Sequence, residues 1–512
     1  MDTVLNKHIN REREPVLTAK LKRYGESDFY PLHMPGHKRR AYGCMPEEVL
    51  RMDITEIDGF DNLHQPEGIL QELQEHAAEL FGAEETYYLV NGSTCGILSA
   101  VSAAVPEGGH ILIARNCHKS VYHACYLRNL TISYLYPELL EAYDICEPIT
   151  CRQVQEALDQ EADIDAVLVV SPTYEGRIAD IRKIAEVVHA KGIPLIVDEA
   201  HGAHLGFAEG FAKNSCRLGA DLVINSVHKT LSAMTQTALL HVNGDLIDRN
   251  KLRRFLHIYQ SSSPSYVLMA SIENALWQVE HHGVEMFGEF IHRWRKMCDT
   301  LSTMKCLSIL PPEEKQDLGK LLVSVKKTGL SGQQLYGILL EEYHIQLEMA
   351  APGYVLAMFT VGDDEEGYAR MTEALLQIDA RLEKSGSGVS PENLWGRDFE
   401  VMQFGMPGRT AADLQPNSIP FYKAWDRETQ WCELSACQGK YAGEFINLYP
   451  PGTPMIVPGE QIDSGLIARI RECLEKGLSV QGIRQVSGEI YLPIIMFENE
   501  SGSIGQNESE RT

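Results

Sequence analysis

Short apolar runs alternate with amphipathic stretches through the middle of the chain. Strands that are buried on both faces of a sheet have such continuous apolar runs. The sequence has these runs at residues 86–90, 111–114, 166–170, 194–197 and 222–224. Apolar residues with helical spacing lie between them, at residues 68–81, 96–104 and 181–190. The alternation predicts a parallel sheet that is covered by helices on both faces.

The pattern changes beyond residue 270 and indicates further domains. A long helical stretch at residues 271–304 precedes strand-like runs near residues 321–325 and 354–361, which predict a smaller α/β domain. Residues 384–391 are rich in Gly, Ser and Pro, a composition typical of linkers. We therefore expect an N-terminal segment at residues 1–50, a large domain at 51–270, a small domain at 271–383, a linker at 384–392, a C-terminal domain at 393–499 and a disordered tail at 500–512.

Composition narrows the class of protein. The formal net charge of −25 repels nucleic acid and anionic membranes, so we expect neither as a partner. The 12 cysteines form no Cys-x-x-Cys pair and no Cys/His spacing suited to zinc, which predicts reduced thiols and no metal site. The first 14 residues are charged, and no apolar run approaches the roughly 20 residues that span a bilayer. We expect a cytoplasmic protein.

Two charged residues follow neighbouring apolar runs. Asp198 ends the run at residues 194–197, and Lys229 comes shortly after the run at residues 222–224. Ligands bind beyond the carboxyl ends of the strands in an open parallel sheet, so these opposite charges are expected to share one crevice. Pyridoxal 5′-phosphate (PLP) needs both: a lysine for its aldehyde and a carboxylate for its pyridine nitrogen.

An anion-binding segment is indicated at Gly92, Ser93 and Thr94, which follow the run at residues 86–90 and open a helix. Free N–H groups and the helix dipole at such a position favour a phosphate. An ordinary N-cap would use the same residue types. The segment lacks the Gly-Lys-Ser/Thr of a nucleotide-binding P-loop.

Other loops at the same edge carry residues suited to an aromatic cofactor. His118 follows the run at residues 111–114 and could stack on a pyridine ring, or be an exposed loop histidine. Thr173 follows the run at residues 166–170 and could bond the phenolic oxygen, although Pro-Thr-Tyr is also favourable turn chemistry. Ala200 is small enough to let a ring lie flat against the backbone.

These residues together resemble the Orn/Lys/Arg decarboxylase family of bacterial PLP enzymes, which has the fold-type-I (aspartate-aminotransferase-like) architecture. The resemblance covers nearly the whole chain. Its motifs are Met-Pro-Gly-His-Lys at 34–38, Asp-Ile-Thr-Glu at 53–56, Asp-Asn-Leu-His at 61–64, Asn-Cys-His-Lys-Ser at 116–120, Pro-Thr-Tyr at 172–174, Asp-Glu-Ala-His at 198–201, Ser-Val-His-Lys at 226–229, Tyr-Pro-Pro-Gly-Thr-Pro at 449–454 and Pro-Gly-Glu at 458–460.

The resemblance implies an α/β fold: a large domain with a mostly parallel seven-stranded sheet, a smaller α/β domain and a C-terminal α+β domain. Lys229 would bond covalently to PLP, Asp198 would pair with the pyridine nitrogen, and His118 would stack on the ring. These three and His228 are the expected catalytic residues. Further cofactor-binding residues would be Gly92, Ser93, Thr94, Thr173, Ala200, His201, Ser226 and His228.

The resemblance also implies an assembly and a substrate site. Ser261 and Ser262 match a segment that family members extend across a dimer interface to the partner's phosphate, so we expect a homodimer or higher homo-oligomer with shared sites. A polar loop would also suit four consecutive small residues. Glu348 matches a carboxylate that faces the substrate's distal cation, although an exposed glutamate between elements has the same pattern.

The expected reaction is decarboxylation of a basic L-amino acid in polyamine metabolism. Arginine, giving agmatine, is favoured, then lysine, giving cadaverine, and ornithine, giving putrescine. Larger family members carry an N-terminal wing domain, which we expect to be missing here. The alternatives are a PLP aminotransferase, which would need a small-domain arginine for the α-carboxylate, and a catalytically silent PLP-fold regulator. Arg370 and Arg381 look like helix-surface residues, and intact Lys229 and Asp198 argue against the regulator.

Overall fold

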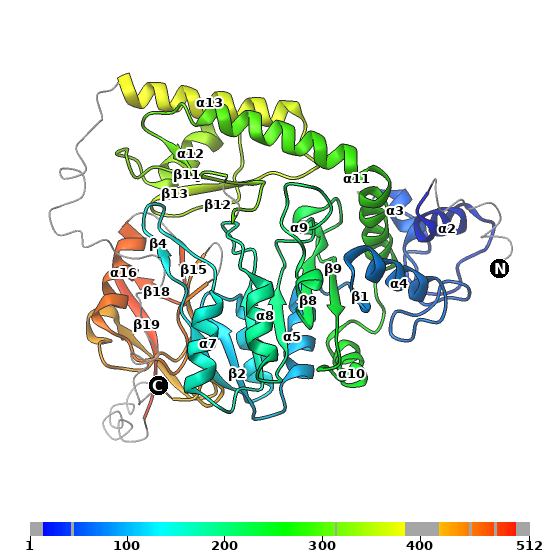
Figure 1. The fold of residues 1–512 in the computed structure, drawn as a ribbon, viewed down its shortest axis with the longest axis horizontal. Helices are drawn as coiled ribbons and strands as arrows, with labels where there is room; N and C mark the ends of the chain where they lie inside the picture. The colour runs from blue at the N-terminus through cyan, green and yellow to red at the C-terminus, as the bar shows by residue number, and fades with distance from the viewer. Residues whose placement is uncertain are drawn as a thin grey trace, which may run out of the picture.

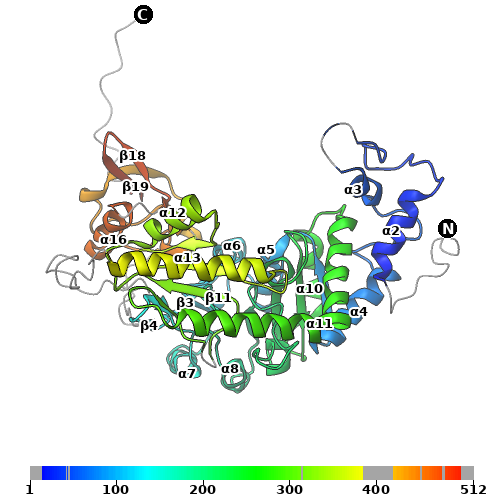
Figure 2. The same ribbon diagram turned by 90° about the horizontal axis from the view of Figure 1, so that it is seen from above.

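The computed structural model describes residues 14–41, 43, 46–312, 315–384, 419–449, 453–475 and 479–497. The predicted linker beyond residue 384 and the predicted tail lie outside these ranges. The other predicted domain boundaries stay predictions. The described chain has an N-terminal helical arm at one end and the C-terminal sheets at the other, with the large sheet between them (Figures 1 and 2).

A seven-stranded sheet forms the centre of the structure. The five strands β8, β7, β6, β2 and β3 run parallel, β9 pairs antiparallel with β8, and the edge strand β1 pairs antiparallel with β9. In sheet order the strands are β1 (Glu85–Leu89), β9 (Ala238–Val242), β8 (Leu222–Ser226), β7 (Leu195–Asp198), β6 (Ala166–Val170), β2 (His110–Ala114) and β3 (Thr131–Leu135). The predicted mostly parallel seven-stranded sheet is confirmed.

The apolar runs located five of these strands and missed β3 and β9. β3 alternates exposed and buried positions at the sheet edge, so it has no continuous apolar run. β9 is fully buried but contains His241, which interrupts its apolar character. The helix expected at residues 96–104 begins earlier, as α5 (Gly92–Ala104).

Helices cover both faces of the sheet because alternate residues of each strand point to opposite sides. In β2, Ile111 and Ile113 belong to one core cluster, whereas Leu112 and Ala114 belong to another. The first cluster lies under α5, α6 (Lys119–Leu127) and α10 (Arg249–Tyr259). The second lies under α7 (Cys151–Gln160) and α8 (Ile181–His189). This packing leaves the carboxyl ends of the parallel strands open for a site.

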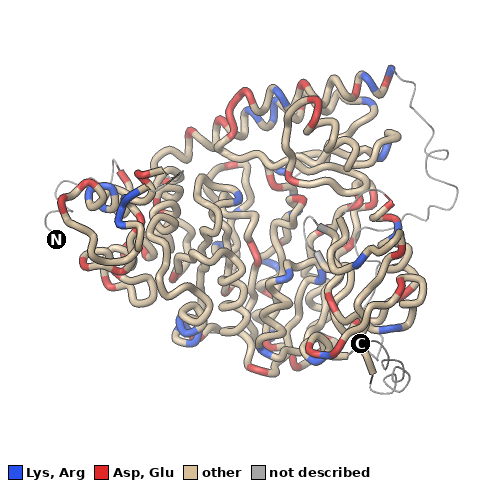
Figure 3. Tube along the Cα trace, turned by 180° about the vertical axis from the view of Figure 1, so that it is seen from behind, with Lys and Arg blue, Asp and Glu red and all other residues tan. Residues whose placement is uncertain are grey.

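One long helix, α11 (Tyr266–Leu301), connects the arm to the second sheet (Figure 1). Its N-terminal half packs on α2 (Val16–Glu26), α3 (Glu47–Met52) and α4 (Ile69–Phe81). Its C-terminal half packs against α13 (Glu365–Lys384). Acidic and basic residues are interspersed along the outer helices rather than segregated by sign (Figure 3).

The second sheet is a small antiparallel one that carries part of the site. Its order is β10 (Ser308–Ile309), β11 (Lys320–Ser324), β13 (Tyr354–Met358) and β12 (Met349–Ala350), with α12 (Gly332–Tyr343) beside it. Residues 315–317 pair with the turn after β6: Ile178 N donates to Lys315 O at 2.9 Å, and Asp317 N donates to Gly176 O at 2.7 Å. These bonds attach the small sheet to the large one.

The C-terminal part has two three-stranded sheets. One has the order β14 (Thr429–Glu433), β19 (Glu489–Ile495) and β18 (Arg484–Val486). The other has the order β16 (Thr453–Ile456), β15 (Ile446–Tyr449) and β17 (Ser479–Gln481), with α16 (Ser464–Glu475) against it. Among the helices in the described ranges, none has the length and apolar character needed to cross a membrane.

Arg115, at the end of β2, binds the C-terminal part to the large sheet. Its buried guanidinium donates to Glu460 Oε2 at 3.0 Å, to Pro454 O at 3.1 Å and to the Tyr122 hydroxyl at 3.0 Å. Burial opposes the charge on Arg115, but the Glu460 carboxylate and three neighbouring tyrosines raise its pKa. The guanidinium therefore stays charged at the contact.

We expect Arg115→Met to lower the free energy of unfolding by about 3 kcal/mol, because it leaves the Glu460 carboxylate without its buried cation. Urea denaturation followed by circular dichroism measures this loss. Arg152→Met, at an exposed ion pair with Glu138, is the control and should cost under about 1 kcal/mol. Equal losses in the two variants would show that Arg115 does not hold the C-terminal part in place.

Candidate active site

Asp198 and Lys229 lie together at the carboxyl ends of two adjacent parallel strands. Asp198 is the last residue of β7 and is opposite Ile224 of β8, and Lys229 is in the single-turn helix α9 (Val227–Thr230) that follows β8. Burial raises the pKa of Asp198, and the Lys229 cation opposes that rise. Burial lowers the pKa of Lys229, while Asp198 and Glu348 oppose the change. The predicted pair therefore shares one partly desolvated crevice.

His201 connects Lys229 to a second lysine. Its Nε2 is 3.1 Å from Lys229 Nζ, and its Nδ1 is 2.9 Å from Lys320 Nζ. The ring is buried, and burial together with the two lysines lowers its pKa well below the ordinary value. Lys320 begins β11 of the small sheet, so both sheets contribute to the site.

Tyr174 and Glu348 form the outer side of this cluster. The Tyr174 hydroxyl donates to the Glu348 carboxylate, and the Tyr174 ring meets the His201 ring edge to face at 4.9 Å between centroids. Glu348 is exposed, and it is among the charges that raise the pKa values of both Lys229 and Lys320. The Glu348 carboxylate, which is expected to face the substrate's distal cation, is thus close to this cluster and on its solvent-facing side.

The expected phosphate-binding residues gather at the start of α5. Gly92 has a positive φ of 75°, and a Cβ there would meet open space, with no other atom within 4 Å. Ser93 is half-buried and Thr94 is exposed at the first turn of the helix. Ser226, at the end of β8, is fully buried, and its hydroxyl has no hydrogen-bond partner among the described residues.

The two remaining expected catalytic histidines flank the crevice. His118 caps α6, where its ring accepts a bond from Ser120 N, and its ring is open to solvent on one side. Surrounding protein and the Lys229 and Lys119 cations lower its pKa. His228 Nδ1 lies 2.9 Å from Thr237 O, and since a carbonyl only accepts, Nδ1 carries the proton. The other ring nitrogen, Nε2, is then the basic one.

Thr173 and Ala200 lie on the floor of the crevice. The Thr173 hydroxyl accepts from Arg177 N at 3.1 Å, which closes the turn after β6. This contact is the turn chemistry that the sequence left open, and the Thr173 side chain also hydrogen-bonds to the Glu175 carboxylate. Ala200 is 7% exposed, and its backbone N–H donates to Asp198 at 3.2 Å, so it orients that carboxylate.

Ser261 and Ser262 are exposed in the loop between α10 and α11. Ser261 N donates to the Asn91 side chain at 3.0 Å, and its carbonyl lies 2.7 Å from His64 Nε2. Within one chain the loop is therefore close to the start of α5. Its expected reach to a partner stays a prediction.

A cleft opens beside the cluster. It lies between the turn after β6, the small sheet and the C-terminal part, and Thr173, Tyr174, Glu175, Tyr354 and Met455 are among the residues that line it. The C-terminal part contributes four of the lining residues, Leu448, Pro454, Met455 and Arg469.

Two further residues lie at the site without having been predicted from the sequence, Lys320 and Glu175. Lys320 is 3% exposed and directly precedes the apolar run of β11, and a charged residue at the edge of a buried run was the available signal. Glu175 accepts from the Tyr354 hydroxyl at 3.1 Å, and burial raises its pKa. It follows the Pro-Thr-Tyr motif, but nothing local distinguishes it from a turn residue.

Arg370 and Arg381 lie on exposed positions of α13, as expected. Arg370 donates to the carbonyls of Tyr343 and His344 at 3.1 Å, and Arg381 donates to Glu342 and the Tyr343 hydroxyl. Both guanidinium groups form hydrogen bonds with the C-terminal end of α12, and neither has a hydrogen bond to a residue of the site. The arginine that an aminotransferase would use is therefore not provided by these two residues.

The residues in the crevice fit PLP. The buried Ser226 hydroxyl lacks a partner, as a phosphate-binding group would before its ligand arrives. The buried Asp198 carboxylate has one hydrogen bond, from Ala200, and a protonated ring nitrogen would supply the second. Lys229, Asp198, His118 and Ser226 would hold the group from four sides.

Comparison with known proteins identifies the family of the chain. The family model for the Orn/Lys/Arg decarboxylase major domain matches residues 15–320, and the model for the C-terminal domain of the same family matches residues 410–476. An arginine decarboxylase of Halalkalibacterium halodurans is 31% identical over 93% of this chain and 96% of its own length. An arginine decarboxylase of Bacillus subtilis is 30% identical over 92% of this chain and 96% of its own.

Solved structures share the fold. The Francisella novicida lysine decarboxylase LdcF superimposes with a TM-score of 0.79 at 19% identity, covering 95% of this chain and 82% of that one. A serine palmitoyltransferase of Sphingomonas wittichii has a TM-score of 0.50 over 61% of this chain. The expected fold-type-I architecture is confirmed.

Proposed function

Because the chain belongs to the Orn/Lys/Arg decarboxylase family, it is an amino-acid decarboxylase, and we propose that it removes the α-carboxylate of a basic L-amino acid with PLP as cofactor. The observation that carries the proposal is the pairing of Asp198 and Lys229 at adjacent strand ends. In this pair Asp198 can stabilise a cationic ring, and Lys229 can supply a reactive amine.

When bound, PLP supplies an electron sink for the pair of electrons that carbon dioxide leaves behind. Asp198, buried and oriented by Ala200, would hold a proton on the ring nitrogen and so keep that sink effective. His118 would cover one ring face. Ser93, Thr94 and Ser226 would fix the phosphate and so orient the bond to be broken relative to the ring.

The reaction then needs a proton at the α-carbon. Lys229 and His228 are the candidates on this side of the crevice. For His228 the atom that would carry the proton is Nε2, since Nδ1–H is committed to Thr237 O. Burial lowers the pKa of both groups, so each releases a proton more readily than in water.

Arginine is the favoured substrate, followed by lysine and ornithine, and the reaction would serve polyamine synthesis. Two relatives at about 30% identity are named arginine decarboxylases and align over nearly their whole length. Glu348 and Glu175 place carboxylates around the outer side of the site, where a distal cation would pair with them. The substrate order is tested by measuring kcat/KM for the three amino acids separately. A lysine value tenfold above the arginine value would reverse the order.

We expect Glu348→Gln to raise KM for the basic substrate about tenfold, because it removes a charge that faces the distal cation. The change should leave kcat within about threefold, since Glu348 is remote from the bond that breaks. Steady-state kinetics with carbon dioxide release measures both constants. Glu342→Gln, at an exposed pair with Arg381 on the far side of α12, is the matched control. An unaltered KM in Glu348→Gln would remove this residue from the substrate site.

The proposed assembly is a homodimer in which Ser261 and Ser262 reach the partner's phosphate site. The exposed position of this loop and of Thr94, near the start of α5, supports a shared site there.

A further inference from the structure

Glu199 is a buried carboxylate beside the site, and it takes no part in the proposed reaction. It follows Asp198 in the chain and is 1% exposed. Burying a carboxylate costs free energy unless hydrogen bonds or a cation satisfy it. The hydrogen-bond partners of Glu199 therefore show what its side chain does.

The Glu199 carboxylate bonds to two other elements. Its Oε2 accepts from Ser215 N at 2.9 Å and also contacts the Ser215 hydroxyl, and Ser215 opens the short helix η1 (Ser215–Leu218). Its Oε1 accepts from Nδ2 of Asn225 in β8 at 3.2 Å, and the same nitrogen donates to the Glu199 carbonyl at 3.0 Å. All three side chains are buried. We call Glu199, Ser215 and Asn225 the clamp, because together they hold the end of β7 against β8 and η1.

The clamp lies on the other side of the sheet from the crevice. Glu199 N donates to Ile224 O at 3.0 Å, so the pairing of β7 with β8 extends through Glu199. Successive side chains of a strand point to opposite faces, which separates Glu199 and Asn225 from Asp198 and Ser226. The residues two positions earlier belong to two core clusters in the same way, Val197 and Val223 to one and Ile196 and Ile224 to the other. The clamp can therefore act on the site only through the backbone.

The turn that the clamp holds carries three residues of the site, Asp198, Ala200 and His201. Gly202 closes this turn with a bond from its N to Glu199 O at 2.8 Å. A Cβ at Gly202 would come within 2.6 Å of Glu199 Cγ, so the turn packs directly on the Glu199 side chain. A shift of that side chain would move the backbone of the turn.

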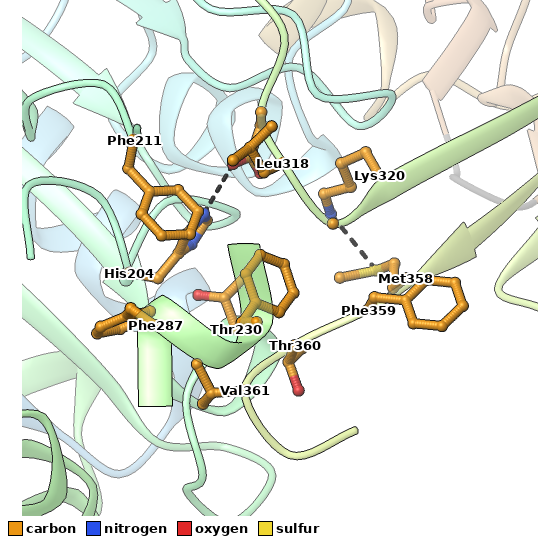
Figure 4. Close-up of a pocket in the computed structure, with 13 residues that line it drawn as sticks. His204, Phe211, Thr230, Phe287, Leu318, Lys320, Met358, Phe359, Thr360 and Val361 are labelled. Carbon is orange, nitrogen blue, oxygen red and sulfur yellow. Dashed lines mark hydrogen bonds and ion pairs between the residues drawn. The ribbon is translucent and has the colours of Figure 1, made fainter. Parts of the chain in front are cut away.

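The far end of this segment is fixed by a separate contact. His204 Nε2 lies 2.7 Å from Asp317 Oδ1, beside the small cavity that Figure 4 shows. Both residues are buried, and Asp317 belongs to the segment that leads into β11 of the small sheet. Residues 198–204 are thus held between β8 and the small sheet, and the clamp is the attachment on the β8 side.

We propose that Glu199 is a positioning residue: by accepting bonds from Ser215 and Asn225 it fixes the backbone of residues 198–202, and so sets where the Asp198 carboxylate lies relative to Lys229. The inference rests on the proposed function for the roles of Asp198 and Lys229. Glu199 acts through Asp198 and does not itself reach the crevice.

Hydrogen-bond accounting explains why this position needs a carboxylate. Ser215 N and Asn225 Nδ2 are both N–H donors, so both oxygens of Glu199 must accept. The Asn225 amide cannot turn over to offer its oxygen, because its nitrogen also serves the Glu199 carbonyl. A glutamine has one acceptor oxygen and would set its NH2 group against one of the donors. Glu199→Gln therefore keeps the size of the side chain and breaks one arm of the clamp.

The test compares PLP-loaded Glu199→Gln with Asp221→Asn, a matched change at the other end of the same two strands. Asp221 is buried at the amino end of β8, where it accepts from Leu195 N of β7 at 2.8 Å. In Glu199→Gln we expect kcat to fall at least about tenfold and KM to stay within about threefold, because a displaced Asp198 affects the reaction more than substrate binding. Asp221→Asn should keep both constants within about threefold of the parent values. Thermal denaturation of both variants ensures that folded proteins are compared.

A spectroscopic measurement separates positioning from a purely structural role without turnover. The pH midpoint of the absorbance of the lysine-bound cofactor responds to the charge beside the ring nitrogen. In Glu199→Gln this midpoint should move in the same direction as in Asp198→Asn, and in Asp221→Asn it should stay at the parent value. Because Glu199 acts through Asp198, the double variant Asp198→Asn/Glu199→Gln should lose no more than about threefold in kcat beyond Asp198→Asn.

Asn225→Ala keeps the proposal testable if Glu199→Gln does not fold. It removes the β8 arm of the clamp and should move the midpoint in the same direction by a smaller amount. An unchanged midpoint in folded Glu199→Gln or Asn225→Ala would overturn the proposal. So would an equal fall in kcat in Asp221→Asn, or losses that multiply in the double variant. Absence of decarboxylation in the parent protein, with the midpoint shifts still present, would refute the proposed function and leave the positioning role standing.

Discussion

Lys229→Ala should have no measurable decarboxylase activity and no visible absorbance from lysine-bound cofactor. The Nζ group is the amine within the crevice that lies beside Asp198, and alanine offers neither a nucleophile nor a proton carrier at that position. Covalent catalysis and cofactor retention are lost together, so the expected fall in kcat exceeds about a thousandfold. Absorbance spectra after dialysis with PLP, and carbon dioxide release, measure the two effects.

The control for this variant is Lys326→Ala, which removes an ion-paired lysine from the turn that follows β11. It should keep both absorbance and turnover. Turnover in Lys229→Ala at more than about one tenth of the parent value would contradict the assignment of the crevice as the active site. The same result would also refute the choice of Lys229 over Lys320 as the cofactor lysine.

Asp198→Asn is the second variant for which we expect a large loss of activity. The amide has the same shape and can keep its contact with Ala200 N, but it lacks the charge that would hold a proton on the ring nitrogen. We expect kcat to fall at least about a hundredfold, the range measured when a single electrostatic contact to a developing charge is removed. Cofactor binding should persist, because Lys229 and the phosphate residues remain. Carbon dioxide release measures kcat, and cofactor absorbance measures how much PLP is bound.

Asp379→Asn provides the comparison for that variant. Asp379 is also buried, but it accepts bonds from the backbone of residues 305–307 at the far side of the small sheet. Its loss should affect thermal stability and leave kcat unchanged. If Asp198→Asn lost no more activity than Asp379→Asn, the proposed role of Asp198 on the ring nitrogen would be wrong.

The pattern of apolar residues along the sequence is sufficient to predict most strands of the large sheet. Strands buried on both faces have continuous apolar runs, and the carboxyl ends of two such runs predict Asp198 and Lys229 as neighbours. The edge strand β3 and the histidine-containing β9 lack that signature. The start of α5 was placed late because Gly92, Ser93 and Thr94 have low helix propensity and form the first turn.

The rest of the site depends on contacts that sequence spacing cannot reveal. His201 and Lys320 are 119 positions apart, and Tyr174 and Glu348 are 174 apart. Each pair forms only when the small antiparallel sheet packs on the turn after β6. The order of elements does not determine that packing, because three of the four side chains lie on loops and the fourth, Lys320, is at the start of a strand. Glu348 is exposed, but its contact with Tyr174 places it beside the site, so exposure alone does not separate a site residue from a surface glutamate.

The measurement that tests the central claim most directly is the stoichiometry of products from the PLP-loaded protein with L-arginine. Carbon dioxide and amine are quantified in the same reaction, with any keto acid measured in parallel. Decarboxylation predicts one carbon dioxide and one agmatine per arginine consumed, and no keto acid. A keto acid formed without carbon dioxide, from arginine, lysine or ornithine, would contradict the account and favour transamination.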